Sequence, residues 1–133
     1  MKKMSNKRVE LREMLYQYIP HKERLDSLEK ELLSVKNDPN EISLLLEEKR
    51  IITAYMEECK KIYDDIKECC GERAAKVVWD SYAMRMGAVN VALKYGMSKR
   101  SYEVWVDFWL DKHYLIDETV KNGESPWVFA SEN

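Results

Sequence analysis

Hydrophobic residues recur at alternating steps of three and four residues near the start of the chain. The series begins at Leu11 and ends at Val35, with His21 as its polar member. This spacing places successive side chains on one stripe of an α-helix, as in a coiled coil. Pro20 lies within the series and lacks the amide hydrogen that a continuous helix needs. The pattern therefore predicts a long helix that Pro20 kinks or divides.

A second series with the same spacing begins at Ile42 and ends at Cys70. Asp38 and Pro39 precede it, and these residue types are preferred at the N-terminal cap and first position of a helix. Gly71 follows it and is suited to the C-terminal cap, where a left-handed backbone conformation is common. The sequence therefore predicts a second, longer helix that begins after a turn and ends at Gly71.

The two apolar stripes can pair with each other or with another copy of the chain. Together they predict a helical, coiled-coil-like hairpin over residues 5–70. A two-helix hairpin alone buries little surface, so we expect burial against a second subunit. Lys49 is the one charged residue of the second stripe, and a charge at such a position helps to set the register of paired helices at some cost in stability.

The second half of the chain is expected to form shorter helices, and it is richer in aromatic residues. Glycines at 87 and 96 divide it into three expected helices, over residues 72–84, 88–95 and 98–116. We expect these to form a three-helix domain over residues 72–116. Residues 117–133 contain one lysine and four acids, so they are expected to form an acidic, mostly loose tail.

The last of the three helices is expected to bury an apolar face. That face is formed by Tyr102, Trp105, Val106, Phe108, Trp109 and Leu110. Tyr102, Trp105 and Trp109 could instead be imagined as a platform on which bases stack. Core packing is the favoured interpretation, because these residues recur at helical spacing.

The composition narrows the class of protein. Hydrophobic residues make up 45% of the chain, too many for a disordered protein, and charged residues make up 35%, too many for a membrane protein. Only four glycines and three prolines occur in 133 residues, which favours an all-α fold. Three cysteines, two of them adjacent, do not form a disulfide framework. A cytoplasmic location is therefore expected, and no membrane partner.

No enzyme, metal site or cofactor is expected. Adjacent acids such as Glu47 and Glu48 diverge by about 100° on a helix and so do not share a site. The chain has two histidines and no Cys-x-x-Cys pair that would suit zinc. It also lacks a phosphate-binding loop and a dinucleotide-binding fingerprint.

Residues 88–107 fit the pattern of a helix-turn-helix. The segment is AVNVALKYGMSKRSYEVWVD. Ala92 is small enough for two helices to cross closely, and Gly96 follows four residues later, where the turn needs a left-handed conformation. Ser98 can cap the second helix. A helical hairpin in any small bundle is the alternative, and we favour DNA binding over it.

In such a motif the outer face of the second helix contacts DNA. The residues expected there are Ser98, Lys99, Arg100, Ser101, Glu103 and Val104. Lys99 and Arg100 are the best candidates for contacts with bases or phosphates. Contacts with the DNA backbone are expected from Asn90, Lys94 and Lys112.

Residues 74–109 resemble the C-terminal helix-turn-helix of sigma factors. The layout of the whole chain is similar to small phage transcriptional regulators of the RinA and ArpU type, which join a helical N-terminal region to a sigma-like DNA-binding domain. The resemblance implies a phage or prophage regulator that acts at a promoter. The apolar patch at Trp127, Val128 and Phe129 could dock on its own domain, which is the favoured interpretation, or on a partner such as RNA polymerase. Two features depart from the family: Met84 and Arg85 replace an acidic-glycine pair, and the recognition helix contains Asp107 and Asp111.

The charge of the expected DNA-binding domain is small. Residues 72–115 contain seven basic and five acidic side chains, a net charge of +2, within a chain of net charge −2. Such a domain gains little affinity from counterion release, so a homodimer with two domains is expected. The alternative is a small helical module that binds and occludes a host or phage protein. Exposed cations on the last helix would favour DNA, and exposed Trp or Phe a protein partner.

Overall fold

The computed structural model describes residues 2–35 and 38–121, and within them the chain is all-α. The helices are α1 (Lys2–Tyr16), α2 (Tyr18–Ser34), α3 (Pro39–Cys70), α4 (Glu72–Val78), the π-helical segment η1 (Trp79–Ala83), α5 (Ala88–Lys94) and α6 (Lys99–Lys121). None of the described helices is long and apolar enough to cross a membrane.

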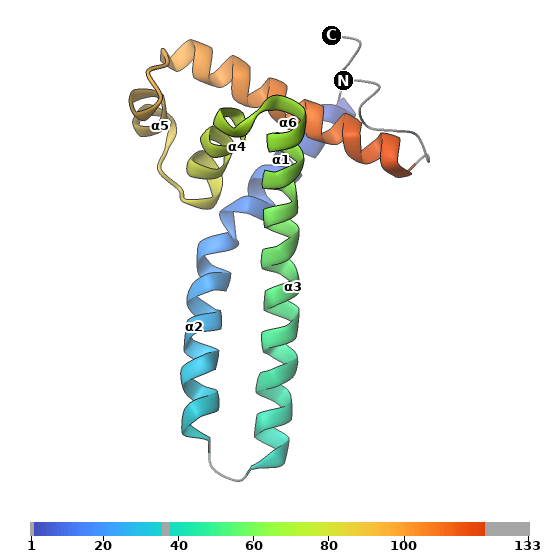
Figure 1. Ribbon diagram of the computed structural model, residues 1–133, viewed down its shortest axis with the longest axis vertical. Helices are drawn as coiled ribbons and strands as arrows, with labels where there is room; N and C mark the ends of the chain where they lie inside the picture. The colour runs from blue at the N-terminus through green and yellow to red at the C-terminus, as the bar shows by residue number, and fades with distance from the viewer. Residues whose placement is uncertain (1, 36–37, 122–133) are drawn as a thin grey trace.

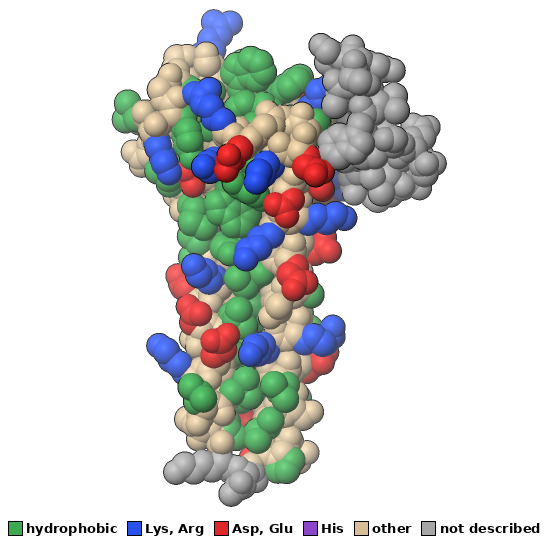
Figure 2. All heavy atoms as spheres, in the orientation of Figure 1, with side chains coloured by type: hydrophobic (Ala, Val, Ile, Leu, Met, Phe, Trp, Pro, Cys, Tyr) green, Lys and Arg blue, Asp and Glu red, His purple; other side chains and the backbone are tan. Residues whose placement is uncertain are grey.

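The helices form an arm and a head. In Figure 1, α2 and the first part of α3 run antiparallel as a long hairpin, which is the arm (residues 18–56). The other helices gather at one end, together with the last part of α3, and form the head. Figure 2 shows charged side chains of both signs along the arm.

The N-terminal helix divides at Gln17, as the position of Pro20 predicts. Pro20 is the third residue of α2, where a helix makes no use of the amide hydrogen. The first amide donor of α2 is His21, whose N–H lies 3.1 Å from the Gln17 carbonyl oxygen. The break turns α1 away from the arm and across the head (Figure 1).

The ends of α3 have the expected caps. The side chain of Asp38 accepts a hydrogen bond of 3.2 Å from the Glu41 amide, and Pro39 is the first helical residue. Gly71 ends the helix with a φ of 104° and donates to the Lys67 carbonyl oxygen. These predictions are confirmed.

The two apolar stripes pair within one chain, where α2 packs against α3. Burial along the arm is shallow, however. Beyond the base at Tyr18, only Leu28 and Ile52 of its described residues are buried. The other stripe residues, including Lys49, are half-buried.

The head has one continuous core, to which α1 contributes. Leu11 and Leu15 of α1 pack with Val77 of α4 and with Val106 and Leu110 of α6. Heptad spacing alone predicts that α1 belongs to the arm, because its apolar residues continue the stripe of α2. In the structure α1 packs mainly against η1 and α6, and it contacts α3 at Met14, whose carbonyl oxygen accepts a 2.6 Å hydrogen bond from the Tyr55 hydroxyl.

The helices after Gly71 follow the predicted order with two differences. The helix expected over residues 72–84 changes from α-helix to π-helix at Trp79. The helix expected to end at residue 116 continues to Lys121, into the segment expected to be a loose acidic tail. The rest of that tail, residues 122–133, lies outside the described residues.

Candidate functional site

A tight turn joins α5 to α6. Gly96 has a φ of 65°, in the left-handed region that favours glycine. The Met97 amide donates a 2.8 Å hydrogen bond back to the carbonyl oxygen of Ala92, which is buried where the helices meet. The predicted roles of Ala92 and Gly96 are thus confirmed in this local geometry.

The first turn of α6 is capped by Ser98, as predicted. Its hydroxyl accepts a 3.1 Å hydrogen bond from the Ser101 amide. The six residues expected to contact DNA are all exposed at this end of the helix. They are Ser98, Lys99, Arg100, Ser101, Glu103 and Val104.

Lys99 and Arg100 are exposed cations without an internal partner. Neither forms an ion pair or a side-chain hydrogen bond with any other described side chain. Their charges therefore remain available to an anionic ligand. Arg73, at the start of α4, instead donates a 2.6 Å hydrogen bond to the Tyr95 carbonyl oxygen and helps to fix the end of α5.

The two acids of α6 that depart from the family pattern face α1. Asp107 is paired with Arg8 at 2.9 Å and also with Arg12, and Asp111 lies 3.0 Å from Arg8. Burial raises the pKa of Asp111 above its ordinary value, an effect that the nearby Arg8 opposes. The charges of these two acids are thus balanced by arginines of α1, whereas Glu103 of the same helix is exposed.

The outward stripe of α6 combines cations with apolar side chains. It consists of Arg100, Ser101, Val104, Trp105, Phe108 and Lys112, at helical spacing and exposed or half-buried. The stripe contains no acid. It therefore has both features that distinguished the two functional hypotheses, an exposed cation without an ion-pair partner, Arg100, and exposed aromatic rings.

The prediction that Trp105 and Phe108 belong to the core is wrong. Trp105 is 49% exposed and Phe108 is 43% exposed, whereas Tyr102 and Trp109 are buried as expected. The physical reason is that these two residues lie on a stripe of α6 that the described helices leave open to solvent. The Trp105 and Phe108 rings pack edge to face, with centroids 5.6 Å apart.

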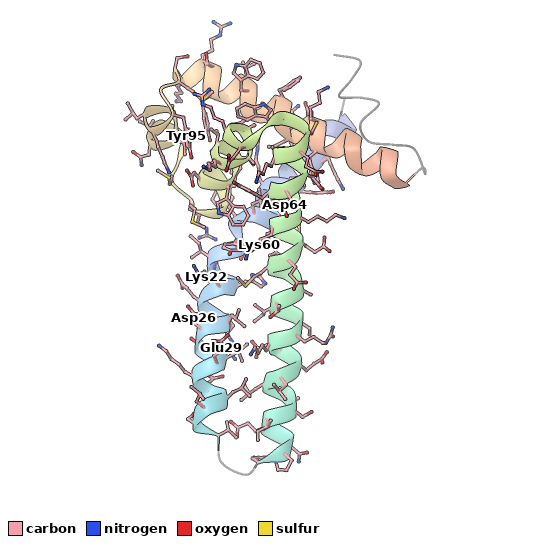
Figure 3. All side chains as sticks on the ribbon, viewed as in Figure 1. Lys22, Asp26, Glu29, Lys60, Asp64 and Tyr95 are labelled. Carbon is pink, nitrogen blue, oxygen red and sulfur yellow. The ribbon has the colours of Figure 1, made fainter. Side chains whose placement is uncertain are left out.

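The three residues expected to contact the DNA backbone are less available. Lys94 is paired with Asp80 at 2.7 Å, and this hydrogen bond raises the pKa of the lysine. Tyr95, labelled in Figure 3, donates its hydroxyl to the same carboxylate at 2.6 Å. Asn90 donates to the Met86 carbonyl oxygen at 2.9 Å, and Lys112 lies over the Phe108 ring at 5.3 Å. Each of the three already has an internal contact.

A pocket beside the turn was not apparent from the sequence. It has a volume of about 480 Å³. Its wall is made by Cys70, Arg73, Gly96, Met97, Ser98, Ser101, Trp105 and Trp109. The wall unites residues far apart in sequence, which no local spacing reveals. Trp105 is thus shared between the pocket and the outward stripe.

The buried histidine of the head pairs with a carboxylate. His113 is buried and its Nε2 lies 3.3 Å from Asp65, which joins α6 to α3. No group of three or more potential ligands occurs in residues 2–35 and 38–121.

Comparison with known proteins matches the chain to no family model, no curated protein and no solved structure. The function of the head is therefore inferred from its geometry and from the resemblance of residues 74–109.

Proposed function

We propose that this protein is a sequence-specific, double-stranded-DNA-binding transcriptional regulator that acts as an oligomer at a promoter. The resemblance adds a phage or prophage origin, and the cysteine content favours a cytoplasmic setting. RNA polymerase is a candidate partner. The observation on which the proposal rests is the capped start of α6, where Lys99 and Arg100 are exposed and unpaired. Asp107 and Asp111 of the same helix are neutralised by α1.

The chemistry of this helix end suits the major groove of DNA. A recognition helix inserts its N-terminal residues between the phosphate backbones. Arg100 can donate two hydrogen bonds to guanine, and the exposed methyl groups of Val104 can contact thymine. Ser98 and Ser101 provide hydroxyl groups for phosphate or base edges. These contacts combine an electrostatic term with base discrimination.

The small charge of the head limits the affinity of one copy. Lys94 is already paired with Asp80, so it adds little to counterion release. Two heads held together would bind adjacent half-sites with a gain from effective concentration. An oligomer is therefore part of the proposed mechanism.

The test is selection of binding sites from a random duplex pool, with a double variant, Lys99→Ala with Arg100→Ala, run in parallel. A matched control is Lys60→Ala with Lys61→Ala, which removes the same charge from exposed positions of α3. We expect the wild type and the control to enrich one motif and the α6 variant to enrich none. No enrichment by folded wild-type protein at low salt would overturn the proposal.

A second candidate function is favoured by the exposed aromatic rings. Val104, Trp105 and Phe108 form a contiguous apolar surface of the kind found at protein interfaces. In that case the double variant Trp105→Ser with Phe108→Ser would abolish capture of the partner, whereas the Lys99 and Arg100 variant would not. If the protein binds DNA, the Lys99 and Arg100 variant should lose site enrichment, whereas the Trp105 and Phe108 variant should keep it.

A further inference from the structure

The arm leaves large aliphatic side chains in solvent near its tip. Leu33 is 88% exposed, Leu44 72%, and Leu46 51%. Figure 2 shows hydrophobic side chains gathered at this end of the arm. Closer to the head, the exposed positions of the arm are mostly charged. A solvated hairpin has no need of leucines at these positions, so their exposure indicates an interface.

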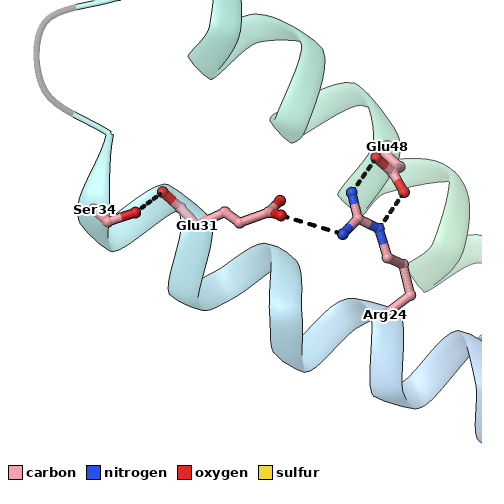
Figure 4. Close-up of polar contacts among 4 residues, drawn as sticks. All are labelled: Arg24, Glu31, Ser34 and Glu48. Carbon is pink, nitrogen blue, oxygen red and sulfur yellow. Dashed lines mark hydrogen bonds and ion pairs between the residues drawn. The ribbon is translucent and has the colours of Figure 1, made fainter.

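One flank of the arm is closed by an internal ion pair. Arg24 of α2 donates to both carboxylate oxygens of Glu48 on α3, at 2.7 and 2.9 Å, and lies 3.4 Å from Glu31 (Figure 4). The charges on this flank are thus satisfied within the chain.

The opposite flank has two stripes whose charges are unpaired. The seam residues are those of the two apolar series through which α2 and α3 pack against each other, such as Leu28 and Ile52. On a helix, the residues three and four positions before a seam residue lie on opposite sides of it. Lys49 therefore flanks Ile52 on the side away from Glu48. Glu29 likewise lies on the side of Leu28 away from Arg24. The stripe on α2 is Lys22, Asp26, Glu29 and Leu33, and the stripe on α3 is Ile42, Leu46, Lys49 and Thr53. Ile42 and Lys49 belong also to the apolar series that faces α2, and they are half-buried at the edge of that contact. Lys22, Asp26 and Glu29 are labelled on α2 in Figure 3.

The two stripes complement each other in order. Counted from the tip, each begins with an aliphatic residue, Leu33 on α2 and Ile42 on α3. Further along, α2 has the acids Glu29 and Asp26, and α3 has Lys49. Among the described residues, none of these three charged side chains has an ion-pair partner.

We propose that the partner on this flank is a second copy of the chain, with the two hairpins side by side and their tips at the same end. A twofold axis along the arm then places α2 of one copy against α3 of the other. Leu33 meets Ile42 and Leu46 of the second copy, beside a hollow of about 930 Å³ on the outer face of α3. Asp26 and Glu29 meet Lys49 of the second copy.

The arrangement turns two shallow hairpins into a four-helix bundle. The half-buried seam residues of each arm become part of a larger core. An antiparallel arrangement would instead place Leu33 beside the charged base of the other arm. The parallel dimer also keeps both heads at one end. In this respect the inference rests on the proposed function, because it states how two DNA-binding heads are joined.

The test is the mass of the full chain in solution, measured by light scattering or sedimentation equilibrium without DNA. We expect twice the chain mass of 15.8 kDa for the wild type. The variant Leu33→Glu with Leu46→Glu should raise the dissociation constant of the dimer about a hundredfold or more. Both residues are exposed, so the helical signal in circular dichroism should not change.

A matched control replaces exposed residues on the closed flank, Ser27→Glu with Ile51→Glu. This control should remain dimeric. Reversal of charge by Lys49→Glu should weaken the dimer, and addition of Asp26→Lys should restore it in part. A monomeric wild type, or a dimer disrupted only by the control, would overturn the proposal. Since no DNA is present, either result leaves the proposed DNA binding to its own test.

Discussion

The guanidinium group of Arg85 donates its Nε–H to the carbonyl oxygen of Tyr16, at 2.8 Å, and Nη2 donates to the same oxygen. In an uninterrupted helix that carbonyl would accept from residue 20. Residue 20 is proline, which has no amide hydrogen. Arg85 therefore satisfies the acceptor that Pro20 leaves open, and it joins the loop before α5 to the break between α1 and α2.

This relationship predicts that the effect of Arg85→Ala depends on Pro20. In the wild type, the substitution should lower the free energy of unfolding by about 1 kcal/mol, because a charged donor is lost at an exposed site. In a Pro20→Ala background, where the amide of residue 20 can reach Tyr16, it should cost clearly less. Urea unfolding of the four proteins measures the difference. Equal costs in both backgrounds would show that Arg85 acts elsewhere. The control is Arg50→Ala, which removes an arginine from the exposed arm and should cost the same in both backgrounds.

The contact between α1 and α6 predicts an effect on both stability and DNA binding. Replacement of Arg12 by Met should destabilise the protein by about 1 kcal/mol, since its pair with Asp107 is only partly buried. It should also weaken DNA binding, because Asp107 keeps only Arg8 as a partner. Lys7→Met, which removes a neighbouring charge from α1, should change neither quantity much. Identical DNA affinities for the two variants would separate this contact from the function of α6.

Features set by short-range spacing could be predicted from the sequence. The caps at Asp38 and Ser98 and the turns at Gly71 and Gly96 each depend on a few adjacent residues, and the structure has all of them. The division of the first helix by Pro20 belongs to the same class. These features follow from local backbone chemistry, which a single sequence states directly.

Features set by packing between distant segments could not be predicted. The heptad spacing of Leu11 continues that of α2, so nothing local indicates that α1 crosses the head. Hydrophobic periodicity likewise does not distinguish Trp109, which is buried, from Trp105, which is 49% exposed. The pairing of Asp107 with Arg8 joins residues about a hundred positions apart, and it removes an apparent obstacle to DNA binding.

The turn between α5 and α6 predicts a strain effect at Gly96. A Cβ at this position would have no atom within 4 Å, so space is not limiting. Its φ of 65° is nonetheless costly for alanine, by roughly 1–2 kcal/mol. Gly96→Ala should therefore lower the midpoint of urea unfolding, and Gly96→Asn should lower it less, because asparagine tolerates this conformation. Equal stability of the two variants would argue against a strained turn.

Burial of Cys59 predicts that its reactivity is low and strongly dependent on pH. Desolvation raises the pKa of this thiol to about 11, and the side chain is fully buried beneath α1. The group stays protonated in the folded protein while it ionises when unfolded, so its contribution to stability is complete at neutral pH and is lost as the pH rises toward 11. Alkylation of native Cys59 at about pH 8 should be at least a hundredfold slower than in denaturant. Mass spectrometry of the peptide containing Cys59 measures both rates, and Cys59→Ala identifies any signal from Cys69 or Cys70. Equal rates in the native and denatured protein would mean that α1 does not cover this part of α3.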